Sequence, residues 1–307
     1  MAQPSGSHVI RFGDNLAALR ELPDGFADLV YVDPPFNTGR RRRLQRLATS
    51  RAADGQGDRT GFGGLRYTTS RLAIRSFDDA FDDYLAWLEP RLAESRRVLS
   101  PRGSLYLHVD YREAHYCKVL LDGLFGRRQF LNEIIWAYDF GGRPRRRWPA
   151  KHDTILVYVR DPRQYVFDTS EVERIPYMAP GLVGPEKAAR GKLPTDTWWH
   201  TIVPTSGAER TGYPTQKPLG ILRRIVAASS RPGDRVLDFC AGSGTAGEAA
   251  RELGRTFYLV DNNPEAMRVM ARRFAGLADV RWEGWDPEAD GPTGATRRAP
   301  GGDRSLA

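Results

Sequence analysis

The sequence predicts an α/β fold in which helices cover both faces of a doubly wound, mostly parallel sheet. Short apolar runs end in an acidic residue or a turn, as buried parallel strands do when helices cover both faces of a sheet. Helical segments alternate with these runs, and a glycine-rich turn joins one of them to a helix. The predicted strands are residues 29–33, 104–110, 154–160, 235–240 and 257–261.

The predicted helices follow from apolar spacing and from capping residues. Apolar residues between positions 81 and 92 recur at helical spacing, and a second helix is expected over 219–228. A third should run from Thr245 and end before Gly254, because glycine is favoured just beyond a helix. The fourth begins with Asn263 as N-cap and Pro264 at the first helical position.

The composition of the 307 residues predicts one large domain with insertions. A segment rich in Arg, Gly, Ser and Thr is expected to form a mobile basic loop. A Pro- and Gly-punctuated segment without periodicity is expected to be an insertion, and the Pro-, Gly- and Asp-rich tail to be disordered. The predicted units are a first scaffold segment at 1–36, the basic loop at 37–76, a second scaffold segment at 77–160, the insertion at 161–212, a third scaffold segment at 213–285 and the tail at 286–307.

The charge balance favours a polyanionic partner. Lys and Arg number 46 against 38 Asp and Glu, a net charge of +8. The arginines are clustered, which favours a nucleic acid over a general compositional bias, although solvated loops also carry such runs. The clusters are Arg40, Arg41, Arg42 and Arg43, and Arg143, Arg145, Arg146 and Arg147 with Trp148.

Other protein classes are not expected. No apolar run approaches membrane-spanning length, and the first residues lack the apolar core of a signal peptide. The cysteines, Cys117 and Cys240, lie far apart and outside any CxxC motif, so neither a disulfide framework nor a metal site is predicted. A reducing, cytoplasmic location fits this usage.

The first candidate catalytic motif is Asp33-Pro34-Pro35-Phe36, directly after a predicted strand. The lone pair of an aromatic amino group is delocalised into the ring, so the nitrogen is a poor nucleophile. A carboxylate and a backbone carbonyl that accept hydrogen bonds from this group would localise the lone pair on nitrogen. Asp33 and the Pro34 carbonyl could form that acceptor pair, and Phe36 could stack on an extruded base. A strand-ending turn remains the alternative interpretation.

The second motif is the glycine turn Asp238-Phe239-Cys240-Ala241-Gly242-Ser243-Gly244-Thr245, which leads into a helix. Small residues allow a ligand to approach the backbone, and a helix amino terminus favours a carboxylate. Asp261 ends the next strand at the spacing where acidic residues bind ribose hydroxyls. No GK[ST] follows, which excludes a phosphate-binding P-loop, but a nicotinamide dehydrogenase would share the turn.

Together these motifs resemble the beta class of amino-methylating DNA methyltransferases, in which a DPPY/F motif precedes the FxGxG cofactor motif. The resemblance implies a Rossmann-like methyltransferase fold with circularly permuted motif order and S-adenosylmethionine as cofactor. It also extends to Phe12-Gly13-Asp14-Asn15 and Tyr213-Pro214-Thr215-Gln216-Lys217-Pro218. The implied residues are Asp33, Pro34, Pro35 and Phe36 for catalysis, and Asp14, Lys217, Asp238, Phe239, Cys240, Gly242, Ser243, Gly244, Thr245 and Asp261 for the cofactor.

One residue departs from the family pattern. Cys240 stands where related chains have an aromatic residue, so the side chain beside the methionine moiety is smaller. Neither cysteine follows a proline, so the Pro-Cys nucleophile of enzymes that methylate cytosine carbon is missing. Asp14 as a helix cap and Lys217 as a surface lysine remain the ordinary alternatives.

The expected function is site-specific methylation of N6 of a flipped-out adenine in double-stranded DNA, with both arginine clusters contacting DNA. The insertion at 161–212 occupies the place of a target-recognition region, where Trp198, Trp199 and His200 could contact bases or form a small core. Methylation of N4 of cytosine, methylation of RNA, and a non-catalytic DNA-binding protein stay open as alternatives. A homodimer is possible, and the sequence is silent on a restriction endonuclease partner.

Overall fold

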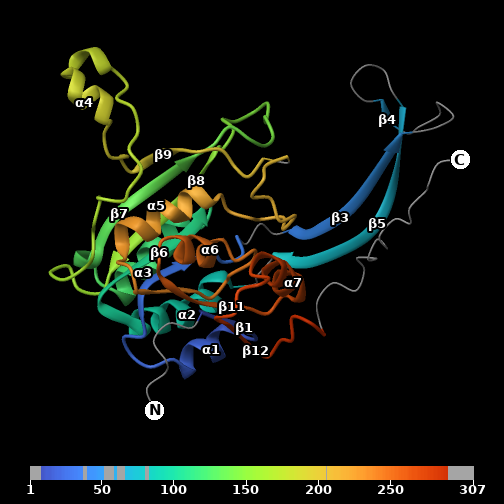
Figure 1. Cartoon of the computed structure of the whole chain (residues 1–307), viewed down its shortest axis with the longest axis horizontal. Helices are drawn as coiled ribbons and strands as arrows, with labels where there is room; N and C mark the ends of the chain where they lie inside the picture. Colours follow the sequence, from blue (N-terminus) through green and yellow to red (C-terminus); the bar gives the residue numbers. More distant parts are fainter. Residues whose placement is uncertain are drawn as a thin grey trace, which may run out of the picture.

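The computed structural model describes residues 8–36, 83–204 and 206–289 in full, and only the backbone of strands within 40–79. Its main element is a nine-stranded sheet (Figure 1). The strands of this sheet are β1 (His8–Phe12), β2 (Ala27–Val32), β6 (Leu99–Asp110), β7 (Phe130–Ala137), β8 (His152–Val159), β9 (Thr197–Trp199), β10 (Arg235–Asp238), β11 (Thr256–Asp261) and β12 (Val280–Glu283).

The strand order is β12-β1-β11-β10-β2-β6-β8-β7-β9. The strands from β12 to β6 are mutually parallel, β8 runs antiparallel between β6 and β7, and β9 pairs in parallel with β7. The predicted mostly parallel sheet is therefore confirmed.

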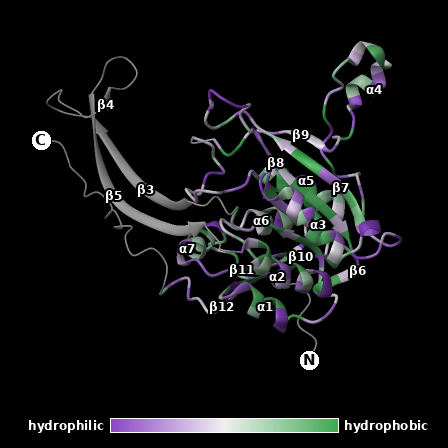
Figure 2. Ribbon diagram, turned by 180° about the vertical axis from the view of Figure 1, so that it is seen from behind, coloured by the Kyte–Doolittle hydropathy of each residue, from purple (hydrophilic) through white to green (hydrophobic). Residues whose placement is uncertain are grey.

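Helices cover both faces of this sheet, as predicted. One apolar cluster contains the buried residues of α1 (Asn15–Glu21), α2 (Tyr84–Val98) and α3 (Ala114–Leu124). A second contains those of α5 (Leu219–Ser229), α6 (Thr245–Glu252) and α7 (Pro264–Arg273). Hydrophobic colour in Figure 2 accordingly concentrates on the central strands and the helix faces turned toward them. Within the fully described ranges, no helix is both long and apolar enough to cross a membrane.

Strand β2, which leads into the Asp-Pro-Pro-Phe motif, packs between these two clusters. Val30 and Val32 belong to the first cluster, while Leu29 and Tyr31 belong to the second. Each of these side chains is at most 2% exposed, because successive side chains of a strand point to opposite faces. The carboxyl end of β2 is therefore held by apolar packing on both sides.

Strand β10 lies beside β2 although more than 200 residues separate them in the chain. Their register pairs Val236 with Leu29 and Leu237 with Val30. Because both strands point the same way, the glycine turn after β10 and the Asp-Pro-Pro-Phe loop after β2 leave the same edge of the sheet. This is the adjacency that the predicted motif order requires. The circular permutation itself stays a prediction.

The prediction of a loop without secondary structure at 37–76 is wrong. The backbone there forms a separate three-stranded antiparallel sheet of β3 (Arg40–Arg51), β4 (Arg59–Thr60) and β5 (Arg66–Asp79). Arginine and glycine content favoured a loop, but the segment also carries Thr, Tyr, Leu and Ile, which are common in paired strands. The side chains of Arg40–Arg43 lie outside the described part.

The insertion at 161–212 contains a 3₁₀ turn at Pro180–Leu182, the short helix α4 (Pro185–Arg190), and β9, which extends the main sheet. Figure 1 shows α4 standing away from that sheet. Trp198 is 7% exposed and packs in the second apolar cluster, so it belongs to the main core and not to a small core of the insertion. Trp199 is 78% exposed. The predicted tail lies outside the described residues from position 290 onward.

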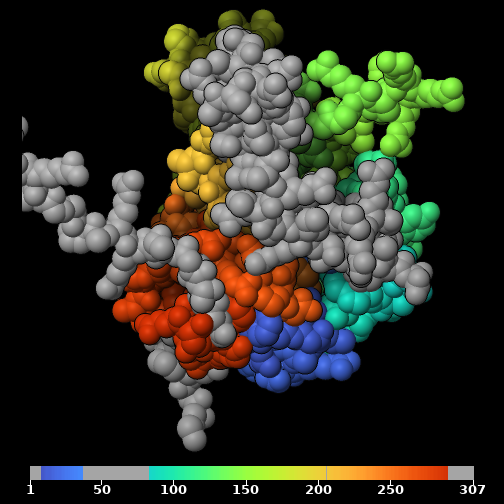
Figure 3. All heavy atoms as spheres, turned by 90° about the vertical axis from the view of Figure 1, so that its right-hand side faces the viewer, coloured from blue at the N-terminus to red at the C-terminus, as the bar shows by residue number. Residues whose placement is uncertain are grey.

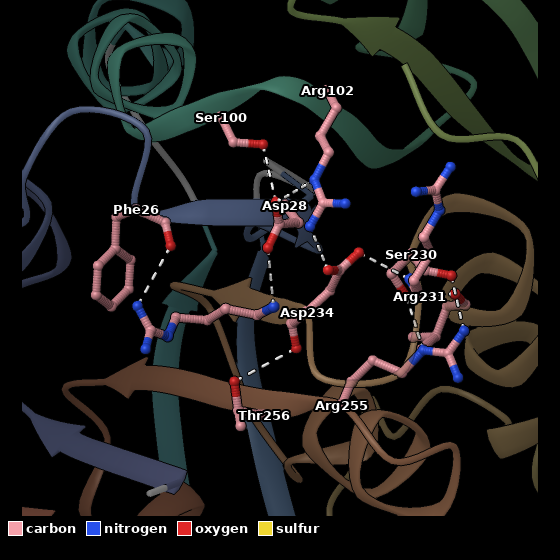
Figure 4. Close-up of polar contacts among 11 residues, drawn as sticks. Phe26, Asp28, Ser100, Arg102, Ser230, Arg231, Asp234, Arg255 and Thr256 are labelled. Carbon is pink, nitrogen blue, oxygen red and sulfur yellow. Dashed lines mark hydrogen bonds and ion pairs between the residues drawn. The ribbon is translucent and has the colours of Figure 1, made fainter. Parts of the chain in front are cut away.

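At the opposite edge from the motif loops, a polar cluster ties β2, β6 and β10 together (Figure 4). Asp28 accepts hydrogen bonds from Ser100 Oγ at 2.9 Å and from Arg102 Nε at 3.2 Å. Arg102 also pairs with Asp234, which is 5% exposed and accepts the Arg231 backbone N–H at 2.7 Å. Buried carboxylates are stable when paired in this way.

We expect Asp234→Ala to lower the free energy of unfolding by about 1–3 kcal/mol, because Arg102 and the Arg231 N–H lose a buried acceptor. Urea denaturation followed by circular dichroism measures the change. Glu21→Ala is the control, because its pair with Arg11 is at the surface and should leave the unfolding free energy nearly unchanged. Equal losses for the two variants would contradict the assigned role of the cluster.

Candidate active site

A cavity of about 890 Å³ opens where β1, β2, β10 and β11 reach their carboxyl ends. This is the edge at which ligands bind in open parallel sheets. All but one of the residues predicted for catalysis and cofactor binding line it. These are Asp14, Asp33, Pro34, Pro35, Phe36, Lys217, Asp238, Phe239, Cys240, Gly242, Ser243, Thr245 and Asp261.

The Asp33 carboxylate has one engaged and one free oxygen. Its Oδ2 accepts a hydrogen bond from Lys217 Nζ at 2.6 Å. Its Oδ1 is buried, and no described atom hydrogen-bonds to it. A buried acceptor without a partner is costly, so this oxygen is suited to receive an N–H from a ligand.

Lys217 also contacts the aromatic residue of the same loop. Its Nζ lies 4.5 Å from the centre of the Phe36 ring, within range of a cation–π interaction. Both partners are in the cavity wall, so Lys217 is not the surface lysine of the alternative interpretation. It therefore contacts both the carboxylate and the aromatic ring of the Asp-Pro-Pro-Phe loop.

The glycine turn is held by the strand-ending Asp261. Asp261 Oδ2 accepts the Gly242 N–H at 2.7 Å. Gly242 has φ +52°, and a Cβ there would lie 3.1 Å from the Tyr213 ring. Gly244 is the predicted residue that does not line the cavity. A Cβ at Gly244 would lie 2.9 Å from both Met270 and Phe274, so this glycine permits close packing against α7.

Buried carboxyl groups concentrate beneath the cavity. Burial raises the pKa of Asp238 well above its ordinary value, and nearby Asp33 and Asp261 add to this effect. Burial also raises the pKa of Asp261, against hydrogen bonds from the backbone N–H groups of Asn263 and Gly242. Such a site favours a cationic ligand, which would offset the repulsion between like charges. Among the described residues, no three His, Cys, Asp or Glu side chains are placed to hold a metal.

Asp14 caps a helix and also lies in the cavity wall. Its Oδ1 accepts the Ala17 N–H at 2.9 Å and caps α1, while its Oδ2 faces the Arg91 guanidinium at 3.4 Å. The same carboxylate lines the cavity. Capping fixes the Asp14 side chain at the end of β1, so its carboxylate can accept a hydrogen bond from a ligand without a change of rotamer.

Sequence reasoning missed the residues beneath Asp14. Arg91 stacks on the Trp87 ring at 4.1 Å and donates to Asn15 Oδ1 at 2.6 Å. Asn15 Nδ2 donates to the Phe239 carbonyl at 3.0 Å, which links α1 to the turn after β10. An arginine beside Leu88 and Leu92 on the apolar stripe of α2 was the available signal.

A second cavity of about 500 Å³ adjoins the first. The two share Phe36, Lys217 and residues 213–215 of the wall. Seven of the 18 residues that line the second cavity are aromatic, which suits a flat ring. These aromatic residues are Phe36, Tyr111, Trp136, Tyr138, Phe140, His152 and Tyr213.

The second arginine cluster borders this cavity. It lies in the loop between β7 and β8, whose Phe140 and Ala150 line the second cavity. Arg143, Arg145, Arg146 and Arg147 are exposed, and Trp148 is 93% exposed. Figure 3 shows this loop in light green, standing out from the surface.

Comparison with known proteins agrees with this geometry. The sequence profile of the DNA methylase family, covering N6 and N4 methyltransferases, matches residues 27–272. The chain belongs to the DNA methylase family. DNA adenine methyltransferase YhdJ of Escherichia coli is 30% identical to it over 273 residues, 86% of this chain and 82% of the relative. Type II methyltransferase M.HpaI of Haemophilus parainfluenzae is 28% identical, over 88% and 74% of the two chains. The family predicted from the sequence is therefore confirmed.

Solved structures share the fold of this DNA methylase. The M1.HpyAVI–SAM complex matches with a TM-score of 0.55 and 20% identity, over 87% of this chain and 99% of that one. PvuII DNA methyltransferase (cytosine-N4-specific) matches with a TM-score of 0.60 and 15% identity, over 90% of each chain. These likenesses confirm the predicted methyltransferase-type α/β fold.

We expect both cysteines of this DNA methylase to react slowly with Ellman's reagent in the native state. Burial raises the pKa of Cys117 to about 12 and that of Cys240 well above its ordinary value, so little reactive thiolate forms near neutral pH. Labelling in guanidinium chloride provides the control, because unfolding exposes both thiols. Rapid native labelling of Cys240 would contradict this description of its environment.

Proposed function

We propose that this DNA methylase transfers a methyl group from S-adenosylmethionine to N6 of an adenine flipped out of double-stranded DNA. The observation that carries the proposal is the position of Asp33. Its free Oδ1 and the glycine turn at Gly242 share one cavity, so a methyl acceptor and a methyl donor can meet there. Direct transfer requires this proximity.

The residues of the first cavity fit the cofactor. Asp261 would bind the ribose hydroxyls, Asp14 the adenine ring, and the turn before α6 the carboxylate, which a helix amino terminus favours. The buried carboxyl group of Asp238 and the half-buried one of Asp261 would offset the positive sulfonium. When bound, the cofactor supplies an electrophilic methyl group.

The catalytic loop would prepare the amino group. Asp33 and the Pro34 carbonyl accept its two N–H hydrogens, which draws the nitrogen toward tetrahedral geometry and localises its lone pair. After transfer, Asp33 is placed to accept the proton that the methylated nitrogen releases. Lys217 keeps Asp33 Oδ2 engaged at 2.6 Å, so Oδ1 is the oxygen that serves the base. Acceptors organised in advance cost no rearrangement during the reaction.

We place the extruded base in the second cavity. Phe36 lines both cavities and can stack on the ring, and the other aromatic walls can enclose it. The exposed loop with Arg143 to Arg147 and Trp148 borders the opening and would contact the DNA backbone beside the target. We assign target recognition to 161–212 and a further backbone contact to Arg40–Arg43.

Methylation of N4 of cytosine is the alternative, because the family covers both N6 and N4 enzymes. Cytosine N4 carries the same kind of amino group, so the acceptor pair could serve it as well. Asp33, rather than serine, before the two prolines favours adenine. Tritiated-methyl transfer to DNA without unmodified adenine separates the two, since incorporation there would contradict adenine as the target.

The proposed substrate places the enzyme with DNA in the cytoplasm. We treat a homodimer as a separate hypothesis, which analytical ultracentrifugation of the full chain tests. A restriction endonuclease partner is a further hypothesis, tested by cleavage of unmethylated DNA in cells that carry the neighbouring genes.

We expect Asp33→Ala to lower the rate of methyl transfer by at least about 100-fold, because the target nitrogen loses its charged acceptor. Calorimetric titration should show cofactor affinity close to that of the wild type, since the glycine turn and Asp261 are untouched. Scintillation counting of labelled DNA measures the rate. Turnover near the wild-type rate would remove Asp33 from the proposed mechanism.

Replacing Arg143, Arg145, Arg146 and Arg147 with alanine should weaken DNA binding on all sequences. The slope of log affinity against log salt should fall by about 0.9 for each phosphate that the loop no longer neutralises. Arg127 and Arg128 provide the control, because both are exposed but lie at the opposite, amino end of β7. Their replacement by alanine should leave the slope unchanged. Equal effects of the two replacements would mean that net charge alone acts.

A further inference from the structure

A buried chain of hydrogen bonds crosses adjacent strands beneath the catalytic loop. Tyr31 Oη on β2 lies 2.8 Å from His108 Nδ1 on β6. His108 Nε2 lies 3.2 Å from Asp153 Oδ2 on β8, and Tyr138 donates to Asp153 Oδ1 at 3.0 Å. Tyr31, His108 and Asp153 are at most 7% exposed. None of these residues has a part in the proposed transfer step.

The distances fit a His108 tautomer that accepts at Nδ1 and donates at Nε2. Burial raises the pKa of Tyr31, so its hydroxyl keeps its proton and can donate it to His108 Nδ1 when the imidazole carries its own proton on Nε2. Burial opposes ionisation of Asp153, but hydrogen bonds from His108 and Tyr138 and the charge of Lys217 outweigh it and lower the pKa. His108 then donates the proton on its Nε2 to the Asp153 carboxylate. Every polar atom along the chain has a partner, and the loss of one leaves others buried and unpaired.

This chain joins the walls of the two cavities. Tyr31 lines the first cavity, while Asp153 and Tyr138 line the second. The ring of His108 lies between them, 6.0 Å from the Phe36 ring and 5.5 Å from the Trp136 ring, measured between centroids. The Asp-Pro-Pro-Phe loop therefore begins two residues after Tyr31, which is one end of the hydrogen-bond chain. Its last residue, Phe36, lies near His108 in the middle of that chain.

We propose that the Tyr31–His108–Asp153 chain positions the catalytic loop, so that Asp33 faces the methyl donor while Phe36 faces the extruded base. This inference rests on the proposed function. The three residues are positioning residues, because none of them needs to touch the reacting atoms. Apolar packing holds β2 from both faces, and the hydrogen-bond chain adds directional bonds between side chains of neighbouring strands. Small displacements of reacting groups are enough to slow a transfer strongly.

Tyr106, which lies outside the hydrogen-bond chain, provides a matched control. This tyrosine lies directly beside Tyr31 in the register of β6 with β2 and belongs to the same apolar cluster. It is 4% exposed, and its hydroxyl bonds Ser229 Oγ at 2.7 Å. Tyr106→Phe therefore removes a buried hydroxyl and a buried hydrogen bond from the same face, but not from the chain.

The test compares Tyr31→Phe, Asp153→Asn, their double variant and Tyr106→Phe. Single-turnover transfer of a tritiated methyl group to unmethylated genomic DNA is measured at saturating cofactor, together with cofactor affinity and thermal stability. We expect Tyr31→Phe and Asp153→Asn each to slow transfer by about 10- to 100-fold with cofactor affinity within about twofold. The double variant should lose little more than the worse single variant, because the residues act as one unit.

The control separates positioning from stability. Tyr106→Phe should lower the melting temperature as Tyr31→Phe does, yet transfer methyl groups at the wild-type rate. Equal losses of rate in Tyr31→Phe and Tyr106→Phe, or wild-type rates in both chain variants, would overturn the inference while the proposed function stands. Absence of transfer by the wild-type enzyme would overturn the proposed function, and with it the inference. If Tyr31→Phe fails to fold, Asp153→Asn against Tyr106→Phe gives the same decision.

Discussion

The parallel pairing of β2 with β10 is the constraint on which the site depends. It sets the Asp-Pro-Pro-Phe loop beside the glycine turn, although about 200 residues separate the two motifs. In the proposed function neither motif forms a methyl-transfer site alone, since one would present the acceptor groups and the other the donor pocket. The pairing is secured at one end by the polar cluster around Asp28 and Asp234, and along its length by apolar packing on both faces.

The carboxyl groups of the site are unevenly paired with positive side chains, and this affects how a cationic ligand binds. Asp33, Asp238 and Asp261 lie around one cavity, and Lys217 is directly paired with only the first of them. The carboxyl groups of Asp238 and Asp261 would favour a cofactor with a positive sulfonium, whereas the demethylated cofactor is uncharged at sulfur. The same carboxyl groups would then favour the substrate cofactor over the spent one, which assists product release.

Much of this arrangement could be predicted from the sequence. The parallel strands, the caps at Asn263 and Asp14, and the convergence of the two motifs follow from local patterns and from the rule that parallel strands share one edge for ligands. Antiparallel pairing of residues 40–51 with 66–79 could not, because strand pairing between distant segments leaves no local signal in an arginine-rich stretch. Arg91 and His108 were missed for a different reason. Arg91 lies on the apolar stripe of a helix and His108 inside an apolar strand, where only the fold reveals which polar neighbour each one meets.

The second apolar cluster has a consequence for the growing polypeptide. Leu29, Tyr31 and Tyr106 are synthesised early, but α5, α6 and α7, which cover them, come from residues beyond 218. During synthesis, one face of the early strands stays uncovered until the last third of the chain has left the ribosome. Exposed apolar strands are prone to aggregate, so production of this enzyme should depend on chaperones that shield nascent sheets.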